Sequence, residues 1–494
     1  MKRIFYLIIS LCWMAVGCEK TLNKEPLARI EVSQAYKTVD DAAKAVYAAY
    51  APITLNNWTN QGYMHWVLGN VASDDTEKGG ESGSDQLYAQ QISLFNIPTD
   101  NDAIRFAWSS QYIGIRRANL VLENIPNITM DAALQSRYLA EAKFLRGWYY
   151  FNLVKTFGDI PLILSTTLPQ YDLERIPKDK VYEQIIKDLQ EAADGLPLAK
   201  DYANADRGRA TKGAAQAYLG KVYLYLKDNP KAEEWFGKVI TSNEYSLNDD
   251  YFSTFLRAGE NSPENIFQGK FLNDQGAAPL NNIITTVFSS RARNGWGFNL
   301  PTQDFVDAFE PGDPRLWQTV FKNGDVMPDG LVGNVGNSTT GYLTKKAYVP
   351  EYEKLSGSIN AGRDDIYMRL GKVLLWYAEA ANENGNTDEA LTALNDVRKR
   401  ARQGDNVLPD VTERDKVKLR QLIWKEQRVE FGQEFERFFE LVRQGRAGTV
   451  LRAYATKYNT PKGSGFQDGV NEIFPIPQSE INLSKGRLIQ NHGY

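Results

Sequence analysis

Tryptophans and adjacent carboxylates share one polar segment near the start of the chain, residues 56–103. Trp58 and Trp66 lie in it, and Asp74 and Asp75 follow in a stretch that ends in glycines. An aromatic ring offers an apolar face to the C–H groups of a sugar, and carboxylates accept hydrogen bonds from its hydroxyls. Neighbouring carboxylates also suit calcium, although their spacing differs from that of an EF-hand loop. The alternative interpretation is an ordinary solvated loop.

A second polar segment, residues 258–365, adds one ring and one cation to the candidates. Trp296 stands between two glycines, which would leave a face of its ring open. Arg363 precedes a helix that we expect to begin near residue 366, and its guanidinium could reach a hydroxyl. Two plainer roles remain for this segment. Trp296 would then belong to the core, and Asp364 or Asp365 would cap the helix.

The chain offers few groups for catalysis. It has only two histidines, His65 and His492, so a histidine base or a histidine-rich metal site has little to draw on. A glycosidase needs only two carboxyl groups at a suitable separation, but no such pair is identifiable from the sequence. We therefore expect a binding protein without a cofactor, calcium being the one possible ion. A glycoside hydrolase stays as the less favoured alternative.

The N-terminus carries the signature of export. Lys2 and Arg3 precede an apolar run of about a dozen residues, shorter than the roughly twenty that a spanning helix needs. The run reads as a signal peptide over residues 1–17. Residues 15–18 (AVGC) resemble a bacterial lipobox, with alanine where leucine is usual, so we expect Cys18 to be lipidated. Ordinary signal cleavage, which would leave a spare cysteine, is the alternative.

Charge and cysteine content argue against several other kinds of binding site and protein. The chain has 57 Lys and Arg against 61 Asp and Glu, a net charge of −4, and therefore no basic field for nucleic acid. The other cysteine, Cys12, lies inside the segment that would be removed. The mature chain then has no intramolecular disulfide and no thiolate metal site. After the signal peptide no apolar stretch is long enough to cross a membrane.

The elements that must position these residues are mostly α-helices. Residues 18–34 form a polar tether, after which apolar residues recur with helical spacing. The predicted helices cover residues 40–51, 107–125, 130–156, 178–193, 211–226, 366–384, 387–402 and 415–431. The segments 56–103 and 258–365 are predicted to be loop-rich, apart from a short helix at 302–309, and the last 20 residues to be extended. A boundary at 257/258 separates an N-terminal helical region, 35–257, from a C-terminal region, 258–494, that carries the loop-rich ligand face.

A helix pair near residue 220 has the spacing of a tetratricopeptide unit. The residues that carry it are Leu219, Gly220, Tyr223, Ala232 and Phe236. Small residues in such a unit let two antiparallel helices approach closely. The second helix is expected to begin with Asn229 as its N-cap and Pro230 at its first position. A looser unit follows over 370–397. Two units are too few for an open solenoid, so the helices are expected to form a platform for the loops.

Several sequence blocks resemble the SusD/RagB family of outer-membrane lipoproteins. They occur in the family's order and span the mature chain. These blocks are 141–151 (EAKFLRGWYYF), 157–162 (FGDIPL), 369–380 (RLGKVLLWYAEA), 426–431 (EQRVEF), 437–445 (RFFELVRQG), 474–478 (FPIPQ) and 490–494 (QNHGY). One departure is His492, where the family ending usually has proline. The blocks themselves are expected to serve the fold: Glu141, Arg146 and Glu379 in buried ion pairs, and Trp148 and Trp376 in the core.

The resemblance implies a mostly α, tetratricopeptide-like platform with a loop-rich ligand face. It also implies a function. Such proteins are lipid-anchored at the outer membrane, face the cell surface, bind glycans without chemistry, and deliver them to a SusC-like TonB-dependent barrel. The alternative is a lipid-anchored scaffold that uses its helices to bind a protein partner and has no glycan of its own.

Overall fold

The computed structural model describes residues 35–54, 64–167, 173–203, 206–272, 281–354, 362–404 and 406–494. The predicted signal peptide, the lipidation site at Cys18, the tether and Trp58 lie outside these ranges. Across the described residues, no helix is both long and apolar enough to cross a membrane.

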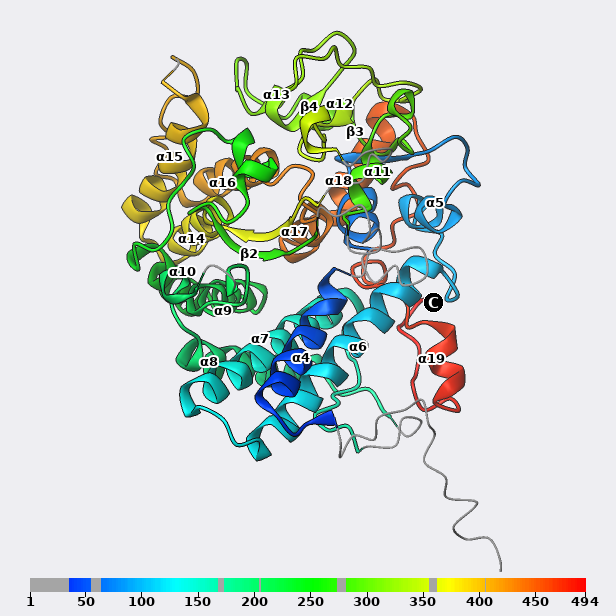
Figure 1. Ribbon diagram of the computed structural model, residues 1–494. Helices are drawn as coiled ribbons and strands as arrows, with labels where there is room; N and C mark the ends of the chain where they lie inside the picture. Colours follow the sequence, from blue (N-terminus) through cyan, green and yellow to red (C-terminus); the bar gives the residue numbers. More distant parts are fainter. Residues whose placement is uncertain are drawn as a thin grey trace, which may run out of the picture.

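Paired helices form one side of the molecule, and the mostly α prediction is confirmed. These helices are α4 (Val39–Tyr50), α6 (Asp102–Asn124), α7 (Ala132–Phe157), α8 (Lys178–Gly195), α9 (Lys212–Tyr225), α10 (Asn229–Thr241), α14 (Leu370–Asn384) and α15 (Thr387–Arg402). From α6 to α10 each helix packs on the next, α10 continues onto α14, and α14 onto α15 (Figure 1). The array is therefore continuous although the chain leaves it between α10 and α14.

Side-chain caps explain where the helices begin. Helix α6 starts earlier than predicted because the Asn101 side chain accepts hydrogen bonds from the backbone amides of Ala103 and Ile104. The N-cap of α10 is Asp228, which accepts from the amide of Lys231. The prediction of Asn229 as this cap is therefore wrong by one residue. Asn229 and Pro230 open the helix, where the missing N–H of proline costs nothing.

The tetratricopeptide-like spacing corresponds to close helix packing. A Cβ on Gly220 of α9 would lie 2.6 Å from the ring of Phe236 on α10, so only glycine permits this approach. Phe236 then stacks on Trp376 of α14, with ring centroids 6.2 Å apart. The two predicted units are thus joined directly through these aromatic rings.

The blocks that carry the family resemblance have the predicted structural roles. Arg146 pairs with Asp188 at 2.7 Å, and Glu141 accepts from Arg209 at 2.8 Å. Glu379 pairs with Arg443 at 2.7 Å. Trp148 and Trp376 are buried in the main hydrophobic cluster. These predictions are confirmed.

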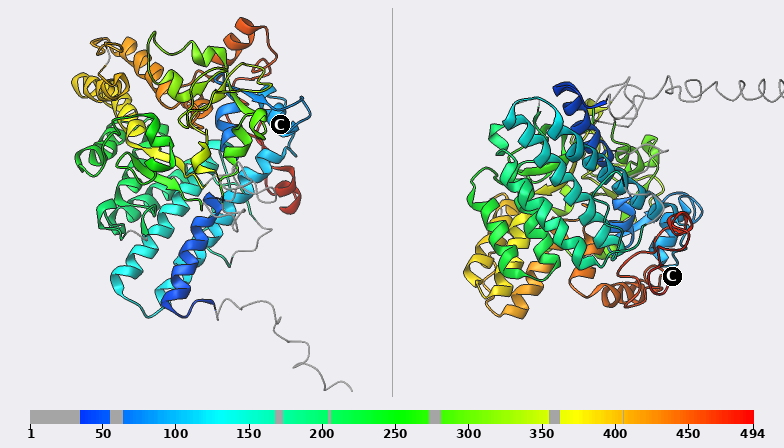
Figure 2. Two further views of the ribbon diagram at one scale, coloured as in Figure 1. Left: turned by 45° about the horizontal axis from the view of Figure 1, so that its top comes forward. Right: turned by 90° about the horizontal axis from the view of Figure 1, so that it is seen from below.

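Short strands and helices organise the loop-rich side. The antiparallel pairs are β1 (Thr76–Gly79) with β3 (Phe298–Pro301), β2 (Asn265–Gly269) with β6 (Asp365–Arg369), and β4 (Val320–Phe321) with β5 (Leu343–Thr344). The short helices there are α5 (Leu87–Leu94), α11 (Ile284–Phe288), α12 (Gln303–Val306), α13 (Leu316–Thr319) and a π-helix (Trp66–Val71). In the left view of Figure 2, the dark-blue helix α4 and the cyan helices α7 and α8 lie at the end of the molecule away from the yellow-green loops that carry α12 and α13.

Two predictions fail where distant strands pair. The segment 56–103 was expected to be loop-like, but it holds the π-helix, β1 and α5. The helix predicted from residue 366 begins only at Leu370, because Asp365 to Arg369 pair with β2. Both strands have partners far away in the chain, and such pairing overrides local helical periodicity.

The C-terminal helices close the loop-rich side against the platform. They are α16 (Lys416–Glu430), α17 (Arg437–Arg443), α18 (Ala447–Tyr458) and α19 (Gln478–Leu483). Helix α19 interrupts the predicted extended tail. The tail returns to the end of α7, where the Asn491 side chain donates to the carbonyl of Phe157 at 3.0 Å and the Phe474 amide to that of Thr156 at 2.8 Å.

Candidate functional site

Trp296 lies in a turn between β3 and a 3-10 helix (Arg291–Arg293) that follows α11. Its backbone amide donates to the carbonyl of Thr286 at 3.0 Å. A Cβ on Gly295 would lie 2.2 Å from the carbonyl oxygen of Ser289, and Gly297 has a φ of +64°. Both flanking glycines are therefore required by the turn. The Trp296 ring is half-buried against the core, so the turn fixes its position and leaves part of it exposed.

Arg363 is only 6% exposed, and its guanidinium is committed to the fold. It donates to the carbonyls of Tyr348 at 2.5 Å and Lys346 at 2.6 Å. Burial lowers the pKa of this guanidinium. The prediction that Arg363 reaches a ligand hydroxyl is thus corrected: its donors hold the 346–348 backbone.

Asp364 and Asp365 are not helix caps. Asp364 forms an ion pair with Lys270, and its other oxygen accepts from the Phe271 amide at 3.0 Å. Asp365 accepts from the side chain of Asn282 at 2.7 Å. These bonds fasten the end of the β2–β6 ladder, which replaces the helical turn that the sequence suggested.

Helix α11 brings Trp296 and Arg363 to the same part of the molecule. Before the helix, the Asn282 side chain donates to the carbonyl of Arg363 at 2.9 Å. In the middle of the helix, the carbonyl of Thr286 accepts from the Trp296 amide. Five residues of helix span about 7 Å, so the two predicted residues flank one short element. A small cavity of about 70 Å³ lies beside it, lined by Asn282, Thr285 and Arg363 among others.

Trp66 is a core residue, which corrects its assignment as a ligand platform. It is 4% exposed, and its ring packs edge-on against Phe288 with centroids 5.6 Å apart. The ring of Phe298 lies 6.1 Å away. The π-helix turns Trp66 inward, so its face is covered by these aromatic rings. Trp58, the other tryptophan predicted in this segment, lies outside the described residues.

Asp74 and Asp75 are buried in a cluster with two arginines. Asp74 pairs with Arg437 at 2.8 Å and with Arg428 at 3.0 Å, and Asp75 pairs with Arg428 at 2.7 Å. Burial opposes ionisation, but the two guanidinium groups hold the pKa of Asp74 well below its usual range. The prediction of free carboxylates for a sugar or for calcium is therefore corrected. Within the described ranges, no group of three or more His, Cys, Asp or Glu is arranged to hold a metal ion.

The structure reveals an exposed tryptophan that the sequence did not single out. Trp317 on α13 is 38% exposed, and Lys322 Nζ lies 4.5 Å from its ring centroid. Tyr352 is 67% exposed on the same loop-rich segment. No flanking glycine or helical spacing marked Trp317, and the only available signal was the density of aromatic residues in 258–365.

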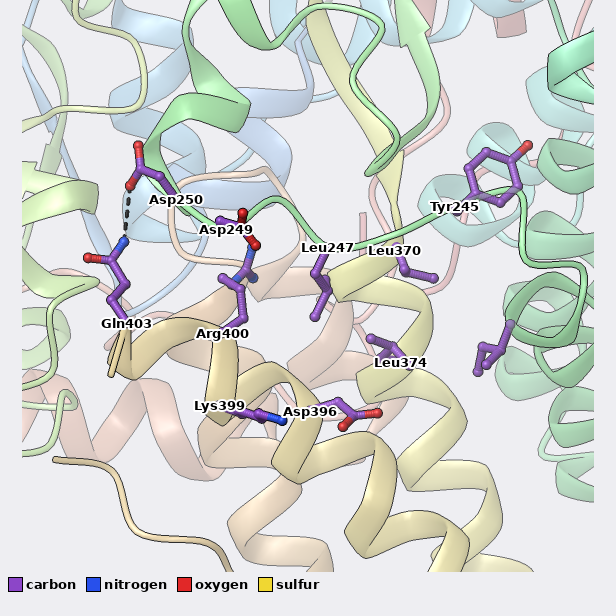
Figure 3. A pocket seen from close by; sticks show the side chains of 11 residues that line it. Tyr245, Leu247, Asp249, Asp250, Leu370, Leu374, Asp396, Lys399, Arg400 and Gln403 are labelled. Carbon is purple, nitrogen blue, oxygen red and sulfur yellow. Dashed lines mark hydrogen bonds between the residues drawn. The ribbon is translucent and has the colours of Figure 1, made fainter. Parts of the chain in front are cut away.

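A larger groove lies on the platform side, between α14, α15 and the segment 245–250 (Figure 3). Its volume is about 830 Å³, and Leu247, Leu370 and Leu374 contribute apolar side chains. One end is crossed by a hydrogen bond of 3.1 Å from the Gln403 side chain to Asp250. The groove contains none of the predicted site residues.

Comparison with known proteins covers nearly the whole described chain. Residues 263–494 match the model of the SusD family, and residues 35–224 match a family described as "Starch-binding associating with outer membrane". SusD-like protein P2 of Formosa agariphila is 25% identical over the full length of both chains. A SusD-like protein of Bacteroides ovatus is 24% identical over 90% of this chain and 82% of its own.

Solved structures agree with this assignment. A laminarin-binding SusD-like protein is 29% identical with a TM-score of 0.81, over 93% of this chain and all of its own. Surface glycan-binding protein A from Bacteroides thetaiotaomicron, solved in complex with laminarihexaose, is 25% identical with a TM-score of 0.78 over 92% of this chain and all of its own. The resemblance noted in the sequence blocks is thereby confirmed, and the chain belongs to the SusD/RagB family.

Proposed function

We propose that this protein binds glycans at the outer membrane without performing chemistry on them. The observation that carries the proposal is the match to a laminarin-binding SusD-like protein, which extends over 93% of this chain with a TM-score of 0.81. A match of this extent includes the loop-rich side as well as the helical platform.

The exposed rings of the loop-rich side are the candidate contacts. Trp296 is held by its glycine turn, and Trp317 is the more exposed of the two. A rigid ring with one accessible face can pack on the C–H groups of a sugar at little entropic cost. Next to Trp296, Arg291 forms ion pairs with Glu81 at 2.6 Å and Asp85 at 3.0 Å, which provide a polar rim.

The two alternatives gain less support. A hydrolase requires a carboxylic acid and a second carboxylate placed for catalysis, whereas Asp74 and Asp75 are both held by arginines. A pure scaffold would use the helical platform alone. A SusC-like barrel as partner is compatible with a scaffold and with a glycan-binding protein. We include this partner in the proposal because the family resemblance implies it.

A glycan panel tests the proposal and its site. Affinity gels with plant, microbial and host polysaccharides, laminarin among them, identify a ligand, and calorimetry then measures its affinity. Trp296→Ala is expected to weaken binding at least about tenfold, which equals 1.4 kcal/mol. Trp235→Ala is the matched control, since Trp235 lies half-buried on α10. An unchanged affinity in Trp296→Ala would remove Trp296 from the site but leave glycan binding standing.

Anchoring and delivery need separate experiments. We propose that Cys18 carries the lipid and that the protein faces the cell surface beside a SusC-like barrel. Cys18→Ala is expected to move the protein from the membrane fraction to the soluble fraction. A barrel protein should co-purify with the wild-type chain. Membrane association of Cys18→Ala equal to that of wild type would contradict lipidation at this residue.

A further inference from the structure

A small polar pocket lies beside α7 and is lined in part by Ile366 and Tyr367 of β6. Its volume is about 30 Å³, and its lining includes His65, Asn152, Lys155, Lys221 and Glu436. The volume equals roughly one water molecule's share of the liquid, so the pocket suits an occupant of that size. None of the residues predicted to contact a glycan lines it.

Two donors on α7 face this pocket without an acceptor. Asn152 is 6% exposed, and its buried amide Nδ2 donates to no acceptor among the described residues. Lys155 follows three positions later, which places both side chains on one face of the helix. Its ammonium forms no ion pair within the described part of the chain and lies 4.4 Å from the ring centroid of Phe439.

The other charges around the pocket already compensate one another. Lys221 pairs with Glu436 at 2.8 Å, and Lys372 lies 3.4 Å from both Glu434 and Glu436. Burial opposes ionisation of Glu436, but Lys221 and Lys372 hold its pKa at about 2, so it is a carboxylate. Glu434 is likewise engaged by Arg369 and Lys346.

His65 and Lys155 are the two remaining basic side chains that line the pocket. Burial lowers the pKa of His65 to about 3, so the imidazole is neutral. Burial, helped by the nearby charge of Lys221, lowers the pKa of Lys155 to about 7. Glu436 and Glu440 oppose this shift, but they pair with Lys221 and Arg443. Any acceptor that entered the pocket would favour the charged form of Lys155.

We propose that this pocket binds a small monovalent anion, with Lys155 Nζ and Asn152 Nδ2 as its donors. The occupant that this volume admits is a free halide, which accepts hydrogen bonds and carries one negative charge. The site links α7 of the platform to the segment 434–436 of the C-terminal region. It is independent of glycan binding at Trp296.

Bromide provides the direct test. Crystals of residues 19–494 grown or soaked in sodium bromide should show an anomalous peak in the pocket, within hydrogen-bond distance of Lys155 Nζ. The melting temperature should also be higher in sodium bromide than in sodium gluconate at equal ionic strength. Lys155→Met should lose both the peak and the temperature difference. Lys143→Met, which removes a half-buried lysine of the same helix that pairs with Glu191, should keep both.

Ordered water in the pocket is the alternative to a bound anion, and the wild-type crystals distinguish the two. Wild-type crystals that show ordered water and no anomalous peak would overturn it, whatever the variants do. If Lys155→Met does not fold, this wild-type measurement alone still decides. Displacement of bromide by chloride is expected, and displacement by galacturonate but not by galactose would overturn the halide assignment. A glycan affinity unchanged in Lys155→Met is expected, because the two sites are separate.

Discussion

At the residue scale, Glu260 and Asp364 show how a carboxylate pair makes stability depend on pH. Glu260 accepts from the backbone amide of Asp364 at 3.2 Å, and Asp364 forms an ion pair with Lys270. Burial, and then the charge of Asp364, raise the pKa of Glu260 to about 7. The folded protein therefore holds a proton on Glu260 more tightly than the unfolded chain does.

The raised pKa of Glu260 makes the folded protein lose stability as the pH rises. Because the pKa of Glu260 is raised in the folded state, the protonated group stabilises the fold at pH values below its unfolded pKa of 4.5. This stabilisation is lost as the pH rises to about 7. Glu260→Gln should abolish the loss, so the variant should gain stability relative to wild type between pH 5 and pH 8. Guanidinium denaturation at both values measures this. Glu183→Gln, on an exposed ion pair, should show no such gain. Equal gains in both variants would contradict the assignment.

Which tryptophans are exposed could not be read from the sequence. Trp66 lies in a segment rich in polar residues but turns inward, because the π-helix directs it toward Phe288. Trp317 carries no local mark and is exposed. Asp74 and Asp75 were recognised as an unusual pair, but their partners, Arg428 and Arg437, stand more than 350 positions later. Tertiary contacts decide all three cases.

At the element scale, glycines on the platform helices have opposite roles. A Cβ at Gly220 would lie 2.6 Å from Phe236, whereas at Gly237 it would meet only the Tyr377 ring at 3.7 Å. Gly220→Ala should therefore destabilise the protein by about 1–3 kcal/mol through overpacking between α9 and α10. Gly237→Ala should instead stabilise α10 by up to about 1 kcal/mol, since alanine is the better helix former.

Denaturant midpoints of the two glycine variants measure this contrast. Both substitutions add one methyl group to a helix of the same hairpin, so each serves as the control for the other. Stabilisation by Gly220→Ala would mean that α9 and α10 do not pack as closely as the structure shows.

Helices were predictable from the sequence to within a few residues because their signals are local. Apolar spacing of 3.6 residues and side-chain caps such as Asp131 and Thr211 mark them directly. The strands β1 and β6 were missed because their partners, β3 and β2, lie about a hundred or more residues away. Nothing in residues 76–79 or 365–369 alone reveals that pairing.

At the scale of the whole molecule, a buried ionic network ties the platform to the C-terminal helices. Arg369 is fully buried and pairs with Glu264 at 2.9 Å and with Glu430 and Glu434 at 2.7 Å each. Arg315 and Arg400 also contact Glu430. Several elements thus meet at one cluster of compensated charges. Two of its members, Arg369 and Glu430, belong to blocks that carry the family resemblance.

Breaking this network should be costly. Arg369→Met leaves three buried carboxylates short of a partner and should destabilise the protein by about 3–5 kcal/mol. Arg452→Met removes an exposed pair with Asp468 and should cost at most about 1 kcal/mol. Thermal and denaturant unfolding compare the two variants. Equal, small losses would show that the network contributes nothing beyond a surface ion pair.

The loop-rich side of the whole molecule is the face on which we propose that a glycan binds. A crystal structure of residues 19–494 with an oligosaccharide selected from the glycan panel tests it most directly. We expect the sugar on the loop-rich side with a ring packed against Trp296. A sugar bound in the groove between α14 and α15, or a folded protein that binds no glycan of a broad panel, would contradict it.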